Sequence, residues 1–203
     1  MADIKNIISK LAARNMRGIF TEKKENVWEL VKSIIPEGAT VGYGGSMTVR
    51  ELGILDLLRE NGRDVIAREN AVTPEERKQI TARIATCDWF IMSTNAITED
   101  GILVNTDGPA SRVSFFCYGP ENVLVIAGKN KIVKDVPAAL ERIRTVAAPK
   151  NTARLNRNTP CRIDGRCHDC QSPDCICGQT VITRRSCVKN RINVIIVGEE
   201  LGY

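Results

Sequence analysis

The chain has no apolar run of about 18 residues, the length that a helix needs to cross a lipid bilayer, so the sequence predicts no membrane-spanning segment. Its first residues mix polar and apolar side chains, and they lack the continuous apolar stretch and cleavage site of a secretory signal. Histidine is scarce as well, because His168 is the only one. Nothing in the sequence pairs Ser46 with a histidine base, so a serine triad has no support. We therefore expect a cytoplasmic protein that does not use a serine triad.

Aromatic residues make up only 4% of the chain, and none lies between residues 149 and 191. That segment holds nine Lys and Arg but three Asp and Glu, so the whole positive excess of the chain lies there. A basic segment can bind nucleic acid, but this one offers no aromatic side chain for stacking on bases. We favour a second interpretation, in which bound cysteine thiolates offset the positive charge.

In other respects the composition is typical of a soluble globular protein, because 43% of the 203 residues are hydrophobic and 26% are charged. Apolar periodicity predicts helices within residues 2–35, after which strands alternate with helices. This alternation predicts an α/β fold, with an open, mostly parallel sheet and helices on both faces. We expect strands at 40–43, 64–67, 89–92, 122–127 and 192–197, and helices at 49–58, from Pro74 onward and at 136–146.

We expect a single domain over residues 1–203, with one irregular segment inside it. From about Pro149 the periodicity disappears, and Cys, Arg, Asn and Pro dominate until the last strand. About 40 residues without regular structure inside a compact domain need another source of order, which crosslinks or a metal can supply. Residues 159–187 are therefore expected to form a metal-binding segment inserted before the last strand.

A glycine turn, Gly44-Gly45-Ser46-Met47-Thr48, joins the strand at 40–43 to the next helix. Glycines let the backbone approach a ligand closely, and the start of a helix favours an anion. The turn matches neither the G-x-x-x-x-G-K-[ST] motif nor the G-x-G-x-x-G motif of nucleotide-binding proteins. It does lie at the carboxyl end of a strand, where open α/β sheets bind their ligands. The alternative is a tight turn in which Ser46 caps the helix.

A second turn, Glu99-Asp100-Gly101, is expected at the tip of a hairpin formed by residues 96–105. Two adjacent carboxylates at a turn are typical of a solvated tip. If the hairpin folds back onto the domain, polar residues nearby could instead line a pocket. Those residues are Asn95, Asn105, Asp107 and Arg112.

Six of the eight cysteines lie close together in the sequence, which packing preference alone rarely produces. Five of them form the pattern C-x5-C-x2-C-x4-C-x-C, and the reducing cytosol favours metal coordination over disulfides. The other two, Cys87 and Cys117, lie in apolar surroundings and are expected to be buried thiols. The clustered cysteines are Cys161, Cys167, Cys170, Cys175, Cys177 and Cys187.

The spacing alone does not identify the metal, because thiolates suit both zinc and iron–sulfur clusters. A zinc ribbon usually has two C-x2-C pairs, and only the pair Cys167 and Cys170 is present. The common ferredoxin spacing C-x2-C-x2-C-x3-C-P is absent as well. An iron–sulfur cluster, a zinc site and a redox-sensing group of thiols all stay open at this point.

Several blocks of the sequence, taken together, resemble the lactate-utilisation (LUD) domain family. The first block is the glycine turn followed by Glu51-Leu52-Gly53, and the second is residues 93–101, which end in a Glu-x-Gly turn. Within that family the chain is most similar to a short, anaerobe-type branch, from about Asn26 to its end. The later blocks are Arg112-Val113, Tyr118-Gly119-Pro120, residues 130–133, Ala147-Ala148-Pro149, Thr159-Pro160-Cys161, Gly165-Arg166-Cys167, Asp169-Cys170, Ile176-Cys177 and Leu201-Gly202.

The resemblance implies a fold like that of sugar-phosphate isomerases and CoA transferases, with a ligand crevice at the strand ends. It also implies a link to the use of lactate or related 2-hydroxy acids, with iron–sulfur proteins as electron-transfer partners. By analogy with the Glu-x-Gly turn of CoA transferases, Glu99 is the candidate catalytic nucleophile. The residues expected to bind a small anionic metabolite are Gly44, Gly45, Ser46, Thr48, Asn95, Gly101 and Arg112.

The same resemblance selects the ligands of a [4Fe–4S] cluster, with zinc as the alternative metal. It leaves Cys175 out and keeps Cys187 in reserve. Asn95 and Asp100 depart from the family's usual second block, which puts a shared substrate in doubt. The ligands selected are Cys161, Cys167, Cys170 and Cys177.

Three functions follow from these observations. The first is an iron–sulfur accessory protein or enzyme of 2-hydroxy-acid oxidation. The second is an acyl- or CoA-transferase-like or sugar-phosphate enzyme with a structural zinc. The third is a non-catalytic regulatory binding module, and a homo-oligomer is compatible with each.

Overall fold

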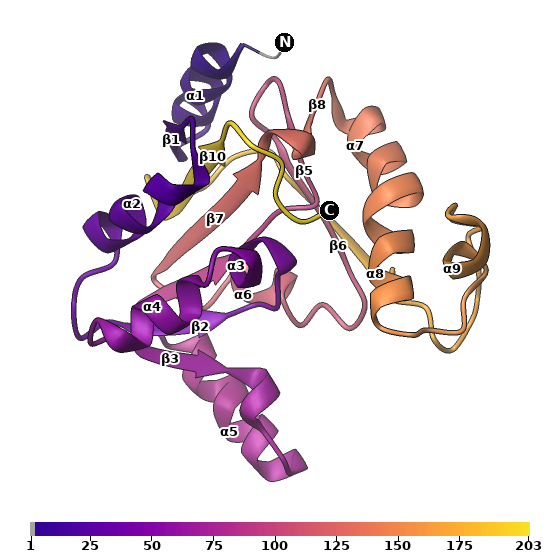
Figure 1. The fold of residues 1–203 in the computed structure, drawn as a ribbon, viewed down its shortest axis with the longest axis horizontal. Coiled ribbons are helices and arrows are strands. Elements are labelled where there is room, and N and C mark those ends of the chain that lie inside the picture. Colours follow the sequence, from indigo (N-terminus) through magenta and orange to yellow (C-terminus); the bar gives the residue numbers. More distant parts are fainter. Residues whose placement is uncertain (1–2) are drawn as a thin grey trace.

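The computed structural model describes residues 3–203, which form an α/β domain around a six-stranded sheet (Figure 1). Every neighbouring pair of strands in this sheet is parallel. The predicted fold class is thereby confirmed. Across the sheet, the strands are β1 (Arg17–Thr21), β10 (Ile192–Val197), β7 (Asn122–Gly128), β4 (Trp89–Met92), β2 (Thr40–Tyr43) and β3 (Asp64–Ala67).

The central strands are nearly continuous apolar runs because helices cover both faces of the sheet. Every residue of β10 is buried, and only the first residue of β7 is not. Parallel neighbours cannot be joined by tight hairpins, so the connecting helices cross over the sheet and pack on it. One face is covered by α1 (Ile4–Ala13), α5 (Pro74–Ala85) and α6 (Val113–Cys117), and the other by α2 (Val27–Ile34), α3 (Met47–Glu51) and α4 (Ile54–Glu60).

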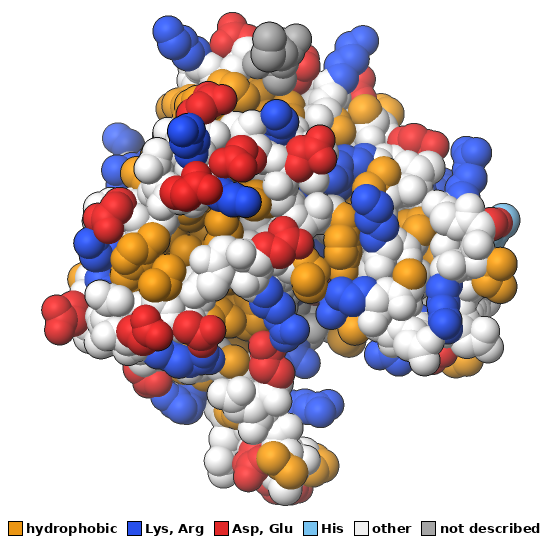
Figure 2. All heavy atoms as spheres, viewed as in Figure 1, with side chains coloured by type: hydrophobic (Ala, Val, Ile, Leu, Met, Phe, Trp, Pro, Cys, Tyr) orange, Lys and Arg blue, Asp and Glu red, His pale blue; other side chains and the backbone are white. Residues whose placement is uncertain are grey.

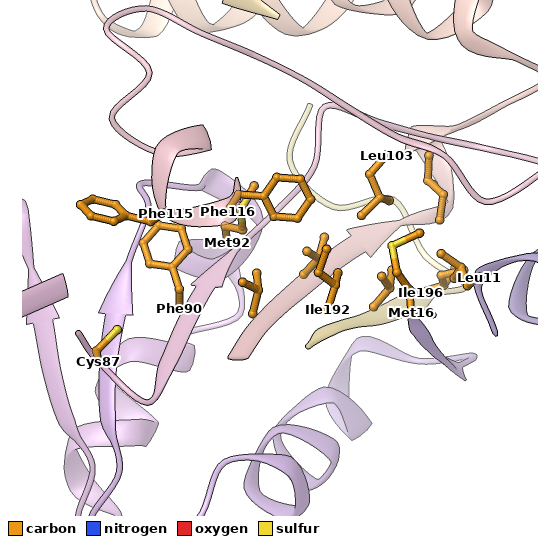
Figure 3. Close-up of a cluster of buried hydrophobic side chains, with 14 of the residues drawn as sticks. Leu11, Met16, Cys87, Phe90, Met92, Leu103, Phe115, Phe116, Ile192 and Ile196 are labelled. Carbon is orange, nitrogen blue, oxygen red and sulfur yellow. The ribbon is translucent and has the colours of Figure 1, made fainter. Parts of the chain in front are cut away.

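The face under α1, α5 and α6 contains the buried phenylalanines of the core (Figure 3). Phe90 of β4 packs on Phe115 of α6, with ring centroids 5.5 Å apart. Farther along the same layer, Leu11 and Met16 pack beside Ile196 of β10. Burying a side chain of this size stabilises the fold by about 1.5–3 kcal/mol. This layer therefore fixes β4, whose carboxyl end forms part of the site described below.

A second sheet, with the strand order β8-β5-β6-β9, lies beside the first. Strand β6 runs antiparallel to both β5 and β9, and α7, a π-helical turn and α8 follow one another without a break against β5 and β6. The elements are β5 (Ala96–Thr98), β6 (Leu103–Asp107), β8 (Ile132–Val133), β9 (Gln179–Thr183), α7 (Val136–Arg142), the π turn (Ile143–Ala147), α8 (Ala148–Arg154), α9 (Pro160–Asp164), and the 3-10 turns Lys24–Asn26, Arg68–Asn70 and Lys129–Lys131.

The predicted strands of the main sheet are all present, and the hairpin predicted at 96–105 is formed by β5 and β6. Thr73 caps α5 as expected, and Glu76 completes a capping box with it. The helical stretch at 49–58 is divided between α3 and α4 at Gly53, whose φ is +63°. Local sequence patterns therefore located most elements correctly.

Three regions differ from the sequence-based expectations. Residues 3–35 contain strand β1 between two helices, and residue 2 of the range predicted as helical lies outside the described residues. The Cys-rich segment 159–187 is not wholly irregular, because it contains α9 and β9. Cys117 was expected to be buried but is exposed, because Phe115 and Phe116 occupy the core-facing positions of the short helix α6.

The surface mixes both signs of charge. Lys and Arg alternate with Asp and Glu over most of the face shown in Figure 2. Helix α5 projects from the lower edge of the molecule in this view (Figure 1), and Ile84 is its only fully buried residue. The positive excess of the chain therefore does not form one continuous patch on this face.

Candidate functional site

A cavity of about 520 Å³ opens at the carboxyl ends of β2 and β4. These strands are neighbours, but the chain places β3 on one side of β2 before returning to place β4 on the other. The cavity thus lies at the switch point of the sheet, where ligands of open α/β folds bind. Its walls are the glycine turn after β2, residues 93–95 after β4, the end of β6, the helix α8 and part of the Cys-rich segment.

The glycine turn forms one wall of the cavity, and its two glycines have different structural reasons: close packing at Gly44 and a left-handed backbone at Gly45. A Cβ atom at Gly44 would lie 2.6 Å from Cζ of Phe90, and Gly45 has a φ of +57°. Ser46 lines the cavity and also caps α3, because its Oγ accepts the Val49 N–H at 3.3 Å. The interpretation of Ser46 as a helix cap is therefore confirmed, and its oxygen has only part of its hydrogen-bonding capacity left for a ligand.

Lys131, which follows β7, is the buried cation of the cavity. Its side chain belongs to a residue that is only 3% exposed. Nζ donates hydrogen bonds of 2.9 Å to Oγ1 of Thr48 and of 2.9 Å to Oγ of Ser93. Thr48 comes from the glycine turn and Ser93 from the end of β4, so the amine joins the two strand ends that frame the cavity.

The surroundings of Lys131 make its positive charge unfavourable. Burial is the largest cause, and the nearby guanidinium groups of Arg142 and Arg112 act in the same direction, whereas Glu51 opposes them. Together they lower the pKa of the Lys131 amine from 10.5 to about 7. At neutral pH this amine is therefore divided between its charged and neutral forms.

Arg112 holds the cavity walls together. Its Nη1 donates to the carbonyl of Ser93 at 3.1 Å, and its Nη2 donates to Oδ1 of Asn95 at 3.0 Å and to the carbonyl of Thr106 at 2.9 Å. Nε lies 3.7 Å from Oδ2 of Asp107. Most of its N–H groups have protein partners, so few of them are left to donate to a ligand. Arg112 therefore contributes mainly positive charge and rigidity to the cavity.

Three further cations of the cavity lining are exposed. Arg50 extends from α3, Arg154 from α8, and Arg157 from the loop that follows. Nε of Arg154 donates to the hydroxyl of Tyr203 at 2.7 Å, and Arg157 lies 3.7 Å from Asp174. Among all the lining residues, Lys and Arg outnumber Asp and Glu by five to two. The cavity therefore attracts anions.

Glu99 lies away from this cavity. It is exposed at the far end of β5, whereas Asn95, at the near end, lines the cavity. The three residues of β5 separate these positions by roughly 10 Å. The turn instead packs on α1, because Asp100 forms a 2.7 Å ion pair with Arg14 and the Cα of Gly101 faces the backbone of α1.

The structure brings six of the seven predicted ligand-binding residues to the cavity, and Gly101 is the exception. The sequence did not predict Lys131 as a site residue. It lies within residues 130–133, which were used only as one of the blocks that resemble the family. A single lysine in a short polar turn carries no periodic signal that its side chain is buried. The predicted residues that line the cavity are Gly44, Gly45, Ser46, Thr48, Asn95 and Arg112.

Four thiols of the Cys-rich segment lie near one another. Burial, followed by the proximity of Cys175, Cys167 and Cys161, raises the pKa of the Cys177 thiol to about 12. The backbone N–H groups of Cys177 and Asp169 donate to the sulfurs of Cys175 and Cys167, each at 3.4 Å. Cys175 also lines the cavity, so the group of thiols adjoins the candidate ligand site.

Cys187 is apart from the other thiols of the segment. It is exposed, and the preceding residue, Ser186, donates its N–H to the carbonyl of Arg14 at the end of α1. As they stand, no three or more His, Cys, Asp or Glu side chains among residues 3–203 are spaced to hold a metal ion. The thiols are thus gathered, but not at coordination distances.

A family model for the LUD domain matches residues 4–197. The chain belongs to the LUD-domain family. A crystal structure of a DUF162 family protein from Deinococcus radiodurans is similar to this LUD domain, with 12% identity and a TM-score of 0.57 over 97% of this chain and 96% of that one. A likeness at this identity shows the fold alone.

A crystal structure of eIF2B beta from Chaetomium thermophilum matches the LUD domain over 56% of its length and 44% of the other chain, with 16% identity and a TM-score of 0.38. No curated protein matches the chain. Within residues 3–203, the LUD domain has no helix with the length and apolar character that crossing a membrane requires.

Proposed function

We propose that this LUD domain binds a small carboxylate metabolite of the 2-hydroxy-acid class, such as lactate, in the cavity around Lys131. The observation that carries the proposal is the buried Lys131 amine, held by two hydroxyls within a cavity whose lining is positive. Burying a charged amine without an anionic partner is costly, and a bound carboxylate would supply that partner. The link to 2-hydroxy acids rests on the lactate-utilisation family to which the domain belongs.

Each part of the cavity has a role in this proposal. Thr48 and Ser93 fix the position of Nζ, because both hydroxyl oxygens accept hydrogen bonds from it. A bound carboxylate raises the pKa of Lys131, so the amine takes up a proton as the ligand arrives.

The test is a calorimetric titration of the wild-type chain and the Lys131→Met variant with lactate. The variant removes the charge but keeps an apolar stem of similar length, and we expect its affinity to fall by about tenfold or more, the value of one charge-assisted hydrogen bond. Lys129→Met is the matched control, because Lys129 lies on the same turn but is exposed and outside the cavity. Equal lactate affinity in the wild type and Lys131→Met would overturn the proposal.

A second proposal is a metal centre on the thiols beside the cavity, either an iron–sulfur cluster or zinc. The chemistry of the donors fits, because soft thiolates are the ligands of both groups, and backbone N–H donors to sulfur accompany such sites. A bound iron–sulfur cluster would supply one-electron transfer and connect the domain to iron–sulfur partner proteins. Cys161, Cys167 and Cys177 are common to the set selected by family resemblance and the set gathered in the structure.

The fourth ligand distinguishes the two sets, because family resemblance selects Cys170 whereas Cys175 lies beside Cys177. Iron, zinc and sulfide would be measured, together with an absorption spectrum, on protein purified without oxygen. An iron–sulfur centre predicts about four iron and four sulfide per chain, and their loss in Cys167→Ser. Cys187→Ser, which alters an exposed and distant thiol, is the control. Comparing Cys170→Ser with Cys175→Ser identifies the fourth ligand, and a metal-free wild type would contradict the proposal.

A further inference from the structure

We propose that the glycine turn separates two anion subsites, and that the second, formed by Arg68 and Arg77, binds a phosphate group. A second cavity, of about 320 Å³, also borders this turn. It shares Gly44, Gly45 and Ser111 with the wall of the Lys131 cavity. The two cavities therefore adjoin each other at the glycine turn.

Arg68 supplies the first guanidinium of this second subsite, and its hydrogen bonding is incomplete. Nη1 donates to the carbonyl of Ser111 at 3.3 Å. Nε is buried and has no hydrogen-bond partner among residues 3–203. Within residues 3–203, the carbonyl of Ser111 is the one hydrogen-bond acceptor that the Arg68 side chain reaches. The guanidinium therefore keeps N–H donors at the cavity that protein groups do not use, and an anion can accept from them.

The charges around Arg68 also favour an anion. Among the described residues, Glu69 is the only carboxylate in the wall of the second cavity. Its charge is offset by Arg50, which forms a 2.9 Å ion pair with it. Arg77 reaches the same cavity from α5. Within residues 3–203, neither Arg68 nor Arg77 forms an ion pair with a carboxylate. Two guanidinium groups without carboxylate partners can bind a dianion from two sides.

Phosphate is the anion that this arrangement fits best. Its tetrahedral oxygens accept bonds from two guanidinium groups at once, and its double charge at neutral pH exceeds that of a carboxylate. Close approach to the backbone is possible at Gly45, because a Cβ atom built there would have no other atom within 4 Å. The natural ligand would then be a phosphorylated carboxylate, with its carboxylate at Lys131 and its phosphate at Arg68. The placement of the carboxylate rests on the function proposed above.

Inorganic phosphate tests the second subsite by itself, because it lacks the carboxylate that the proposal assigns to Lys131. It would be titrated by calorimetry into the full-length wild type, Arg68→Gln, Arg77→Gln, Lys131→Met and Arg83→Gln. Arg77 is exposed, so its replacement leaves the fold intact even if the Arg68 variant is destabilised. Arg83 lies on the same helix but pairs with Asp64 at 2.7 Å, outside both cavities, and serves as the control.

We expect phosphate to bind the wild type, Lys131→Met and Arg83→Gln alike, and to bind Arg68→Gln and Arg77→Gln about tenfold or more weakly. Absence of phosphate binding to the wild type would overturn the inference. Loss of phosphate binding in Lys131→Met alone would overturn it as well, because phosphate would then occupy the first cavity. The lactate titration judges the Lys131 cavity independently, so the two failures are distinguishable.

A two-part ligand gives the second arm of the test. Glycerate and 3-phosphoglycerate are both 2-hydroxy acids and differ by one phosphate group. We expect 3-phosphoglycerate to bind the wild type about tenfold more tightly than glycerate, and the difference to vanish in Arg77→Gln. Equal affinities for the two compounds in the wild type would show that no single ligand of this length spans both subsites, and would overturn the two-part assignment.

Discussion

Among single residues, Lys131 combines the burial of a core side chain with the chemistry of a surface one. Two hydroxyl acceptors offset part of the cost of burying its charge, but Arg142 and Arg112 add repulsion, and its pKa falls to about 7. Thr48 and Ser93 are themselves buried, so the amine has little freedom to reach bulk solvent. A group held in this way gains more from an arriving anion than an exposed lysine does.

Lactate binding should therefore depend on pH. Below about pH 7 the free protein already carries the charged amine, and above that value binding must add a proton to it, so the affinity should fall as the pH rises through about 7. Calorimetry in buffers of different ionisation enthalpy should detect proton uptake on binding in this range. Both effects should be absent from Lys131→Met, and a wild-type affinity that is constant across this range would contradict the assignment.

Sequence reasoning at this scale found the residues whose type is unusual for their place in the chain. The glycine turn could be located because consecutive glycines between a strand and a helix have few structural explanations. Lys131 could not, because its burial results from the approach of β2 and β4, which are far from it in the sequence. Arg112 lines the cavity, but its contacts with four groups at the ends of β4, β5 and β6 follow only from the folded structure.

Among the elements, the short strand β5 serves different parts of the molecule at its two ends. Asn95, just before β5, lines the cavity, whereas Glu99, just after it, is exposed beside α1. A residue at one end of an extended strand cannot also serve the other end. The strand therefore separates the Glu-x-Gly turn from the anion site.

Replacing Glu99 by Gln should leave lactate binding unchanged, because the exposed carboxylate lies beyond the length of β5 from the cavity. Asn95→Ala, at the opposite end of the same strand, is the informative comparison. It removes the amide that accepts from Arg112 and from the Thr106 N–H, and should weaken binding. The two calorimetric titrations would contradict this picture if Glu99→Gln impaired binding as much as Asn95→Ala.

The elements that escaped sequence reasoning share a physical cause. Strand β1 is an edge strand in which only Thr21 is fully buried, so it has neither an apolar run nor a regular alternation. Strand β9 is half exposed at the edge of the second sheet, and α6 is only five residues long. Buried central strands were predictable because both of their faces are covered, whereas the order of strands across the sheet depends on contacts that local pattern does not contain.

For the whole molecule, the buried amine links the stability of the fold to pH. The unfolded chain binds a proton at Lys131 up to about pH 10.5, whereas the folded chain releases it above about pH 7. Between these values the unfolded state holds more protons, so Lys131 makes the fold more stable as the pH rises. The sign is opposite to that of a lysine whose folded-state pKa is raised by a salt bridge.

The free energy of unfolding of the wild type, compared with that of Lys131→Met, should increase by up to about 1.4 kcal/mol per pH unit between about pH 7.5 and pH 9. Denaturant titrations at several pH values would measure both proteins. Burial of the Cys87 and Cys177 thiols raises their pKa values, but these groups are present in both proteins and cancel in the comparison. Parallel pH profiles for the two proteins would contradict a low pKa for Lys131.

The position of β10 has a consequence for how the domain is made. This strand follows every other strand in the sequence, yet it lies between β1 and β7 and pairs with both along its length. As the chain leaves the ribosome, β1 and β7 must each wait with an unpaired edge until residues 192–197 emerge. Such edges can pair with other nascent chains. The newly made protein is thus vulnerable to aggregation until β10 has emerged, and insertion of this strand between β1 and β7 is a late event of its biogenesis.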